Sequence, residues 1–330
     1  MSAPVAPTQT ARHWASIGES TFVGGIWLLG WVHRVLGRLP FRICVYPVVF
    51  YYWATRPLAR RASLDYLRRM QAAHTVFDQA PGMLASLSHF ASFAETILDK
   101  IVALSGRYPA NAIRLDLCDE LAHALHGQRG GLFVTAHVGC IELSQFLASA
   151  HPGLRLTVLV HTAHAEQFTR MMRRLNPLST IAFVQVTDVS ADTAMMLNER
   201  VERGEFVAIV GDRVPVTTPR HAPARFLGHD APFPIGPYVL GALLKCPVFM
   251  LTCLRNPAGS ATRGHTLRCS LLAEQITLPR GQREAALAQW TQRYASQLEA
   301  LLAHAPLEWF NFFDFWNQGA AAPVARPHRP

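Results

Sequence analysis

Charge is scarce in this chain of 330 residues, because charged types make up only 16% of it and lysine occurs only at Lys100 and Lys245. Hydrophobic residues account for 50% of the chain, and the mean hydropathy is +0.14. This composition excludes an intrinsically disordered chain and a fibrous repeat. The protein therefore buries a large core or contacts lipid. Its length suits two domains, or one large α/β domain with appended segments.

Several signatures of cofactor binding and of secretion are also missing. Neither a G-x-G-x-x-G stretch nor a P-loop occurs, so the sequence gives no support for nucleotide binding, and we predict no cofactor. The six cysteines form no C-x-x-C pair, which favours reduced thiols over a disulfide framework. Residues 1–10 lack a basic stretch followed by an apolar run, so we expect no cleaved signal peptide.

The basic residues, by contrast, are concentrated at one end of the chain. The formal net charge is +9. Residues 1–70 hold nine arginines against Glu19 and Asp65, a local net charge of +7, and the other 260 residues carry +2. Because Trp, Tyr and Leu alternate with these arginines, the segment is typical of attachment to an anionic membrane surface rather than of a DNA-binding face. We expect a membrane as partner and no nucleic acid.

Two apolar runs lie inside this basic segment, at residues 22–32 and 43–54. Each is shorter than the roughly 20 residues that a membrane-spanning helix needs. We interpret both as interfacial or re-entrant helices, with tryptophan and tyrosine at headgroup depth and arginines extended to the phosphates. Two alternatives stay open: core helices of a soluble domain, and a single tilted span that would carry Arg34 and Arg38 through hydrocarbon.

The rest of the chain alternates between helix and strand patterns. A helical pattern begins near residue 84 and ends before Gly106. Short β-rich runs follow at 132–136, 154–161, 181–187, 206–211 and 248–254, separated by helical stretches near 141–150, 164–175 and 191–203. This alternation predicts an α/β fold with a mostly parallel central sheet covered by helices.

A second long amphipathic helix is predicted over residues 282–304, and six of the eight residues at 309–316 are aromatic. We interpret this aromatic segment as a plug over the core, with a direct contact to an acyl chain as the alternative. The predicted organisation is a disordered terminus at 1–12, basic aromatic membrane-associated helices at 13–70, an α/β domain at 71–318 and a disordered tail at 319–330.

A His-x4-Glu element provides the first candidate chemistry. Residues 130–137 predict a strand that ends at His137, and Glu142 lies in the first turn of the helix that follows. A histidine at the mouth of a strand can act as general base, and a carboxylate one turn later can fix its tautomer. Gly139 allows the backbone to approach a ligand closely. Cys140 is an alternative nucleophile beside His137, although a small buried residue is the plainer interpretation.

The second element is the stretch at 226–240, Phe-Leu-Gly-His-Asp-Ala-Pro-Phe-Pro-Ile-Gly-Pro-Tyr-Val-Leu. Its Pro-x-Gly-Pro step leads into an apolar helix whose first amides, near Gly236, are free to stabilise an oxyanion or a phosphate. Before it, Asp212 and Arg213 stand at a predicted strand end, and a basic loop carries Arg220 and Arg225.

In order and spacing these motifs, together with Lys245-Cys-Pro247 and Pro306-Leu-Glu-Trp309, resemble the lysophospholipid acyltransferase superfamily. Within it the chain looks most like the late acyltransferases of lipid A biosynthesis and a related group of predicted bacterial acyltransferases. The resemblance implies His137 as base, Glu142 as its partner, and a substrate pocket that includes Phe233, Pro234 and Gly236. It also implies an active site at the cytoplasmic face of a bacterial inner membrane.

The sequence departs from that pattern at the Phe-Pro turn, where Ile235 and Pro237 replace the glutamate and threonine of glycerophosphate acyltransferases. A glycerol phosphate acceptor is therefore not expected. The lipid A enzymes have an arginine after the strand that ends here near residue 161, where this chain has His161 and His164. Two interpretations stay open: the histidines replace that arginine, or they are ordinary surface or core histidines. We expect transfer of an acyl group from an acyl carrier protein or coenzyme A thioester to a hydroxyl of a lipid or glycolipid acceptor, with Gly139, Asp212, Arg213, Arg220 and Arg225 near the substrates.

Three alternatives to acyl transfer remain. The first is a thioesterase or lipid hydrolase, in which water is the acceptor. The second is a membrane protein that binds lipid without catalysis. The third is a zinc site built from His137, His161 and His164, for which no carboxylate or cysteine completes a recognisable spacing. We predict no metal.

Overall fold

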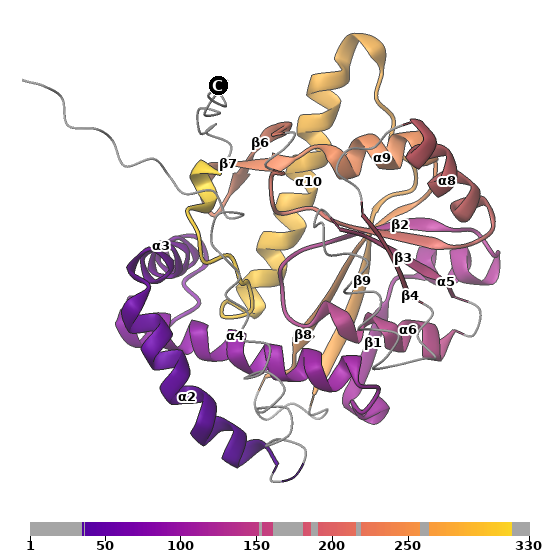
Figure 1. Cartoon of the computed structure of the whole chain (residues 1–330). Coiled ribbons are helices and arrows are strands. Elements are labelled where there is room, and N and C mark those ends of the chain that lie inside the picture. Colours follow the sequence, from indigo (N-terminus) through magenta and orange to yellow (C-terminus); the bar gives the residue numbers. More distant parts are fainter. Residues whose placement is uncertain are drawn as a thin grey trace, which may run out of the picture.

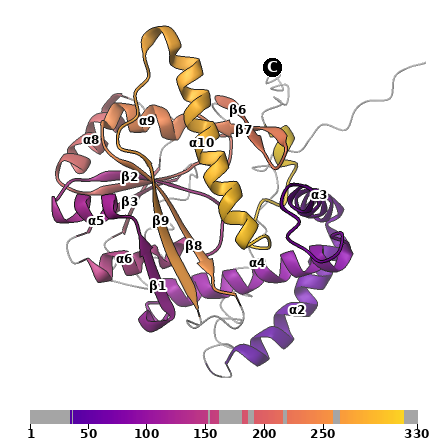
Figure 2. The same ribbon diagram turned by 180° about the vertical axis from the view of Figure 1, so that it is seen from behind.

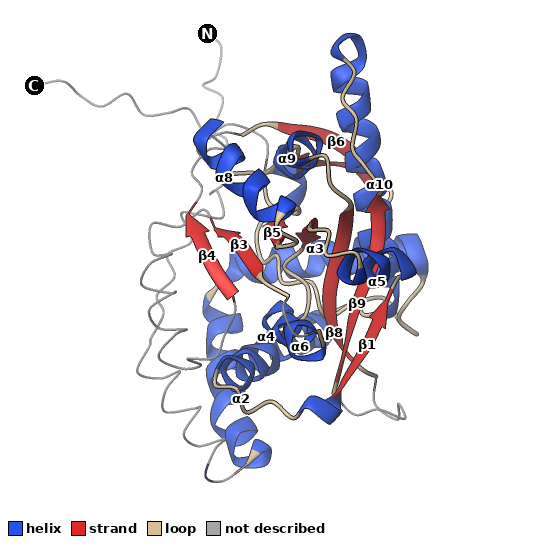
Figure 3. Ribbon diagram, turned by 90° about the vertical axis from the view of Figure 1, so that its right-hand side faces the viewer, coloured by secondary structure: helices blue, strands red, loops and turns tan. Residues whose placement is uncertain are grey.

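Parallel strands form the centre of the molecule. The computed structural model describes residue 35 and residues 37–151, 154–160, 181–185, 191–215, 219–257 and 264–318. Its central sheet has the order β1-β9-β8-β2-β5-β3-β4, and Figure 3 shows it from β4 at one edge to β1 at the other. The strands are β1 (Ile113–Leu117), β2 (Gly131–Thr135), β3 (Leu156–Val160), β4 (Ile181–Gln185), β5 (Phe206–Val210), β8 (Val248–Arg255) and β9 (His265–Ala273).

The direction of the strands confirms the mostly parallel α/β sheet. β2 pairs in parallel with β5 and β8, and β3 pairs in parallel with β4 and β5. β9 is antiparallel to β8 and parallel to β1. β1 and β9, at one edge of the sheet, therefore run opposite to the other strands. The sequence patterns did not predict β1, β9 or the separate hairpin of β6 (His221–Phe226) and β7 (His229–Pro234). Prolines in the hairpin hide its strand pattern, and a two-stranded ribbon tolerates them.

Helices cover both faces of the sheet (Figure 1). Side chains of β2 alternate between two hydrophobic cores: Leu132 and Val134 face the first, and Phe133 faces the second. The first core contains side chains of α3 (Pro57–His74), α8 (Ala191–Glu202), α9 (Gly236–Leu244) and α10 (Arg283–His304). The second contains those of α4 (Met83–Leu104), α5 (Asp119–His126) and α6 (Gln145–Ala150). Short 3-10 turns occur at Ala110–Ala112, Ile141–Ser144, Arg280–Gln282 and Phe315–Asn317.

α2 (Arg38–Thr55) lies at the periphery of the molecule and packs on α4 (Figures 1 and 2). Phe41 and Val45 are buried against Leu98 of α4. The opposite side of α2 remains apolar and uncovered, with exposed fractions of 70% at Leu39, 67% at Ile43 and 53% at Phe50. The second predicted apolar run is therefore a helix with two apolar faces, whereas the first, at 22–32, lies outside the described residues. In the described part of the chain, no helix has the length and apolarity to cross a membrane.

The aromatic segment after α10 is part of the core. Trp309 and Phe315 are almost completely buried, and Trp309 packs edge-on against Tyr66 of α3 and Phe226 of β6. Tyr66 also donates a hydrogen bond to the carbonyl of Pro306. The segment therefore joins α3 to the sheet, as the interpretation of a plug predicted. The two disordered termini predicted at 1–12 and 319–330 lie outside the described residues.

Candidate active site

His137 lies at the carboxyl edge of the sheet, two residues after the last residue of β2. The chain beyond it forms two short bridges. Val138 pairs with Trp309, and Gly139 pairs with Cys253 of β8. The carbonyl of His137 accepts a hydrogen bond from the amide of Phe310, and the amide of Gly139 donates to the carbonyl of Glu308. These backbone bonds fix the position of the histidine from both sides.

Asp212 is the residue that contacts the His137 ring. The Nδ1 atom of His137 lies 2.8 Å from Oδ1 of Asp212, and the His137 amide donates to Oδ2 at 3.1 Å. The parallel register explains this meeting, because Thr135 of β2 is opposite Val210 of β5 and each site residue follows two positions later. Gly211 joins Val210 to Asp212, and this position requires a glycine because a Cβ there would lie 2.5 Å from the side chain of Val134.

The two residues hold each other in a defined protonation state. Asp212 is completely buried, and burial alone would raise the pKa of its carboxyl, but His137 and Arg213 outweigh this effect and hold that pKa below its ordinary value. The Nδ1 atom of His137 therefore carries a proton and donates it to a carboxylate. Burial, assisted by the charge of Arg213, lowers the pKa of His137, although Asp212 opposes this shift. The imidazole is neutral near pH 7.

The remaining ring nitrogen of His137 is available for chemistry. Within the residues that the structure describes, Nε2 has no hydrogen-bond partner, and 33% of the side chain is exposed. A neutral imidazole with Nδ1–H on a carboxylate presents the Nε2 lone pair as a base. The arrangement is therefore suited to removing a proton from a hydroxyl or from water.

Side chains of the C-terminal segment complete the environment of Asp212. Oδ2 accepts hydrogen bonds from the indole N–H of Trp309 at 3.0 Å and from the amide of Asn311 at 2.8 Å. The amide of Gln318 donates to the Asp212 carbonyl. Sequence reasoning assigned no role in the site to these three residues. Their signals were the density of aromatic residues around them and, for Trp309, the Pro306-Leu-Glu-Trp309 motif. The bonds from Trp309 and Asn311 orient the carboxylate and replace the water that it cannot reach, and the bond from Gln318 fixes the backbone of Asp212.

Glu142 is not the partner of the His137 ring, and this corrects the prediction from the His-x4-Glu spacing. Its Oε1 atom lies 3.0 Å from Nζ of Lys100 in α4, and the Cys140 thiol donates to Oε2 at 3.7 Å. Glu142 lies in the 3-10 turn Ile141–Ser144, which packs against α4. The turn directs the carboxylate to that helix, so Asp212 takes the position at Nδ1 that was expected for Glu142.

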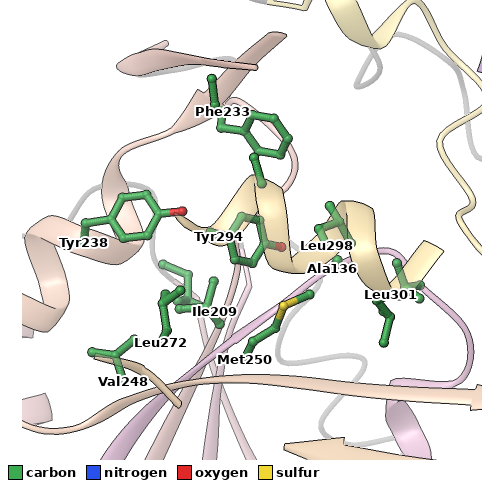
Figure 4. Close-up of a cluster of buried hydrophobic side chains, with 14 of the residues drawn as sticks. Ala136, Ile209, Phe233, Tyr238, Val248, Met250, Leu272, Tyr294, Leu298 and Leu301 are labelled. Carbon is green, nitrogen blue, oxygen red and sulfur yellow. The ribbon is translucent and has the colours of Figure 1, made fainter. Parts of the chain in front are cut away.

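Gly139, Phe233 and Pro234, which were predicted to lie near the substrates, pack closely against the rest of the fold. The φ of Gly139 is +56°, and a Cβ there would lie 2.0 Å from the Cys253 carbonyl oxygen. The close approach of β8 is therefore sufficient to require a glycine at this position. Phe233 and Pro234 are both buried. Figure 4 shows Phe233 next to Tyr294 of α10, above the side chains of the sheet, so its ring is not free to line a pocket.

The predicted arginines divide into one at the site and two away from it. Arg213 donates to Oδ1 of Asn311 at 2.7 Å and to the carbonyl of Phe310, so it supports the segment that holds Asp212. Arg220 is exposed, and Arg225 is exposed and lies 3.5 Å from Asp230. Within the described chain neither contacts His137 or Asp212. Gly236 is exposed at the first position of α9, which runs back from the carboxyl edge to the start of β8.

The alternatives for this site can be placed as well. Cys140 is completely buried, and burial raises the pKa of its thiol, which disfavours a nucleophilic thiolate. His161 and His164 lie outside the described residues, and the described part of the chain contains no cluster of metal-ligating side chains. A hollow of about 680 Å³ lies at the opposite edge of the sheet, between α8 and α9, with Gly130 and Lys245 in its lining. It contains neither His137 nor Asp212.

Comparison with known proteins adds no family to this description. No protein-family model matches the chain, and a search of curated proteins finds no match.

Proposed function

We propose that the protein is a membrane-associated O-acyltransferase in which His137 and Asp212 form the catalytic pair. One observation carries the proposal: a neutral histidine at the carboxyl edge of the sheet holds its Nδ1 proton on a buried carboxylate and leaves Nε2 accessible. The thioester donor and the lipid acceptor come from the resemblance of the motifs to acyltransferases. An acyl carrier protein or coenzyme A would carry the donor, and the acceptor would be a lipid or glycolipid hydroxyl.

In the proposed reaction Nε2 of His137 removes the proton from the acceptor hydroxyl while its oxygen bonds to the thioester carbonyl carbon. The carbonyl electron pair moves to oxygen and returns when the C–S bond breaks. The thiolate leaves with the proton from the imidazolium, which gives an ester and a free thiol. Asp212 stabilises the transient positive charge of His137 and remains ionised throughout.

Transfer of a labelled acyl group by the purified full chain in detergent tests this proposal. Lipid extract serves as acceptor, and acyl carrier protein and coenzyme A thioesters are compared as donors. His137→Ala should lower kcat by about 10² to 10⁴, the usual contribution of a general base. His126→Ala is the matched control, because His126 is an exposed histidine of α5.

The products separate acyl transfer from the alternatives. Free fatty acid in place of an acylated lipid would identify a thioesterase or a lipid hydrolase. Equal turnover by the wild type and by His137→Ala would remove His137 from the mechanism. No turnover by the wild type, together with lipid binding, would favour a protein that only binds lipid.

Membrane attachment through α2 is the second part of the proposal. The exposed apolar residues Leu39, Ile43 and Phe50 are spaced by four and seven positions, so they share one side of the helix. Arg42 lies on the same helix, donates two hydrogen bonds to the Glu95 carboxylate of α4 and is 44% exposed. Its positive charge would add an attraction to an anionic membrane surface. This surface would hold the chain at the cytoplasmic face of an inner membrane.

A vesicle experiment tests the attachment. Ile43→Asp combined with Phe50→Asp should weaken binding to anionic vesicles by more than about tenfold, because burial of each side chain contributes about 1.5–3 kcal/mol. The control is Met195→Asp, since Met195 is an equally exposed apolar residue on α8. Binding that both variants retain would show that α2 is not the anchor.

A further inference from the structure

Lys100 lies beside the catalytic pair and has no role in the reaction described so far. It is in α4, and its Nζ atom is 3.0 Å from Oε1 of Glu142, in the turn that follows His137. The two side chains are 30% and 21% exposed, so the ion pair lies at the surface of the site rather than deep in the core. Burial opposes the charge of Lys100, but Glu142 outweighs it and raises the pKa of the ammonium group.

Two positive charges act on His137, and they differ in what else they bind. Arg213 directly follows Asp212 in the chain, and Lys100 is joined through Glu142 to the turn that follows His137. Both positive charges lower the pKa of His137. The Arg213 guanidinium is held by Oδ1 of Asn311 and the carbonyl of Phe310, and it lies over the Phe313 ring. The Lys100 ammonium has three N–H donors, and Glu142 is its one partner within the described chain. Lys100 is therefore the cation with donors left for a substrate.

We infer that Lys100, held in place by Glu142, donates a hydrogen bond to the oxyanion formed from the acyl carbonyl. The inference rests on the proposed function and adds a catalytic residue to it. When the acceptor oxygen bonds to the carbonyl carbon, the carbonyl electron pair becomes a negative charge on oxygen, and the ammonium group stabilises that charge until the C–S bond breaks. No proton leaves Lys100 in this step.

This assignment also gives the glutamate of the His-x4-Glu element a role. Glu142 does not orient His137, because Asp212 already occupies Nδ1. It positions Lys100, a flexible side chain that would otherwise lose conformational entropy each time it reached the oxyanion. Glu142 is thus a positioning residue, and the five-residue spacing serves to bring α4 to the edge of the site.

Steady-state kinetics of four variants form the first arm of the test. Lys100→Met should lower kcat by about 10² to 10³, which is typical for loss of one oxyanion donor, and should leave the KM of the donor within about threefold. Lys100→Arg should restore part of kcat, because the charge remains, and Glu142→Gln should cost less than Lys100→Met. Lys245→Met is the matched control, since Lys245 is the other lysine of the chain and caps the far end of α9.

Binding of dodecylphosphonate, whose anionic oxygens mimic the oxyanion, forms a second arm that needs no turnover. Lys100→Met should weaken phosphonate binding by at least about tenfold, and it should leave binding of neutral dodecanol unchanged. Wild-type kcat in Lys100→Met, or equal phosphonate affinity in the two proteins, would overturn the inference. Absence of acyl transfer by the wild type would contradict the proposed function instead, and the phosphonate arm would then decide on its own whether Lys100 binds an anion at this site.

Discussion

Two histidines near the aromatic C-terminal segment show how the surroundings of an imidazole decide its use. His89 of α4 is completely buried, with Nδ1 accepting from Ser63 at 3.0 Å and Nε2 donating to the carbonyl of Trp309 at 2.8 Å. His137 has the opposite tautomer, with the proton on Nδ1 and with Nε2 open. Both rings are neutral at pH 7, but only His137 keeps a lone pair for a substrate.

Trp309 connects the two environments. Its carbonyl accepts from His89, and its indole N–H donates to Asp212. On the other side of His89 the chain of donors continues through Ser63 and Ser86 to the indole of Trp53 in α2. His89, whose two ring nitrogens both have partners, thus supports Trp309, and Trp309 helps to hold Asp212 against His137. The comparison separates a histidine with a structural role from one whose Nε2 stays open.

The largest expected effect comes from replacing Asp212, the carboxylate that distinguishes the surroundings of His137 from those of His89. Asp212→Asn should lower kcat by about 10² or more, because the ring loses both its orientation and the charge that stabilises the imidazolium. The variant should remain folded, which circular dichroism can check, since an amide fits the same space. A larger loss of kcat in Glu142→Gln than in Asp212→Asn would contradict the assignment of the pair.

Replacing His89 by alanine tests whether this histidine has a structural role. His89→Ala should lower the free energy of unfolding by about 2–4 kcal/mol, because Ser63 and the Trp309 carbonyl lose buried partners and a cavity forms. Urea unfolding in detergent measures this change. The loss of kcat per folded molecule should be far smaller than the factor of about 10² to 10⁴ expected for His137→Ala.

The same histidine predicts a pH window for stability. Burial lowers the pKa of His89 from 6.5 to about 4, so between these values the unfolded chain binds a proton that the folded protein excludes. Stability should therefore fall as the pH falls from 6.5 towards 4, by up to about 3 kcal/mol. A variant without a titrating group at 89 should lack this part of the acid sensitivity, and an unchanged profile would contradict the assignment.

The smallest expected effect is a shift in the pH dependence of kcat/KM, which tests the role of His137 as a base. His137 must be neutral to act as base, so kcat/KM should fall as the pH drops through its pKa, which lies below 6.5. Arg213→Met removes a positive charge that lowers this pKa, and the acid limb of the kcat/KM profile should therefore move to higher pH. A limb at the same pH as in the wild type would show that Arg213 acts on the fold alone.

The sequence by itself determined much of the framework. The alternation of short β-rich runs with helical stretches predicted the mostly parallel sheet, since each run is long enough for one strand and too short for a helix. It also placed His137 and Asp212 at strand ends, and it predicted that the aromatic residues after α10 form a plug. Strands β1, β6, β7 and β9 were missed, because prolines or a mixed pattern obscured their alternation.

Only the tertiary structure decided which carboxylate serves His137. Glu142 is five residues away in sequence, but its turn packs on α4 and directs it to Lys100. Asp212 is 75 residues away, and it meets the ring because β2 and β5 are neighbours in parallel register. Sequence spacing describes neighbours along one element, whereas the order of strands in a sheet depends on how distant segments pack, and no local pattern carries that information.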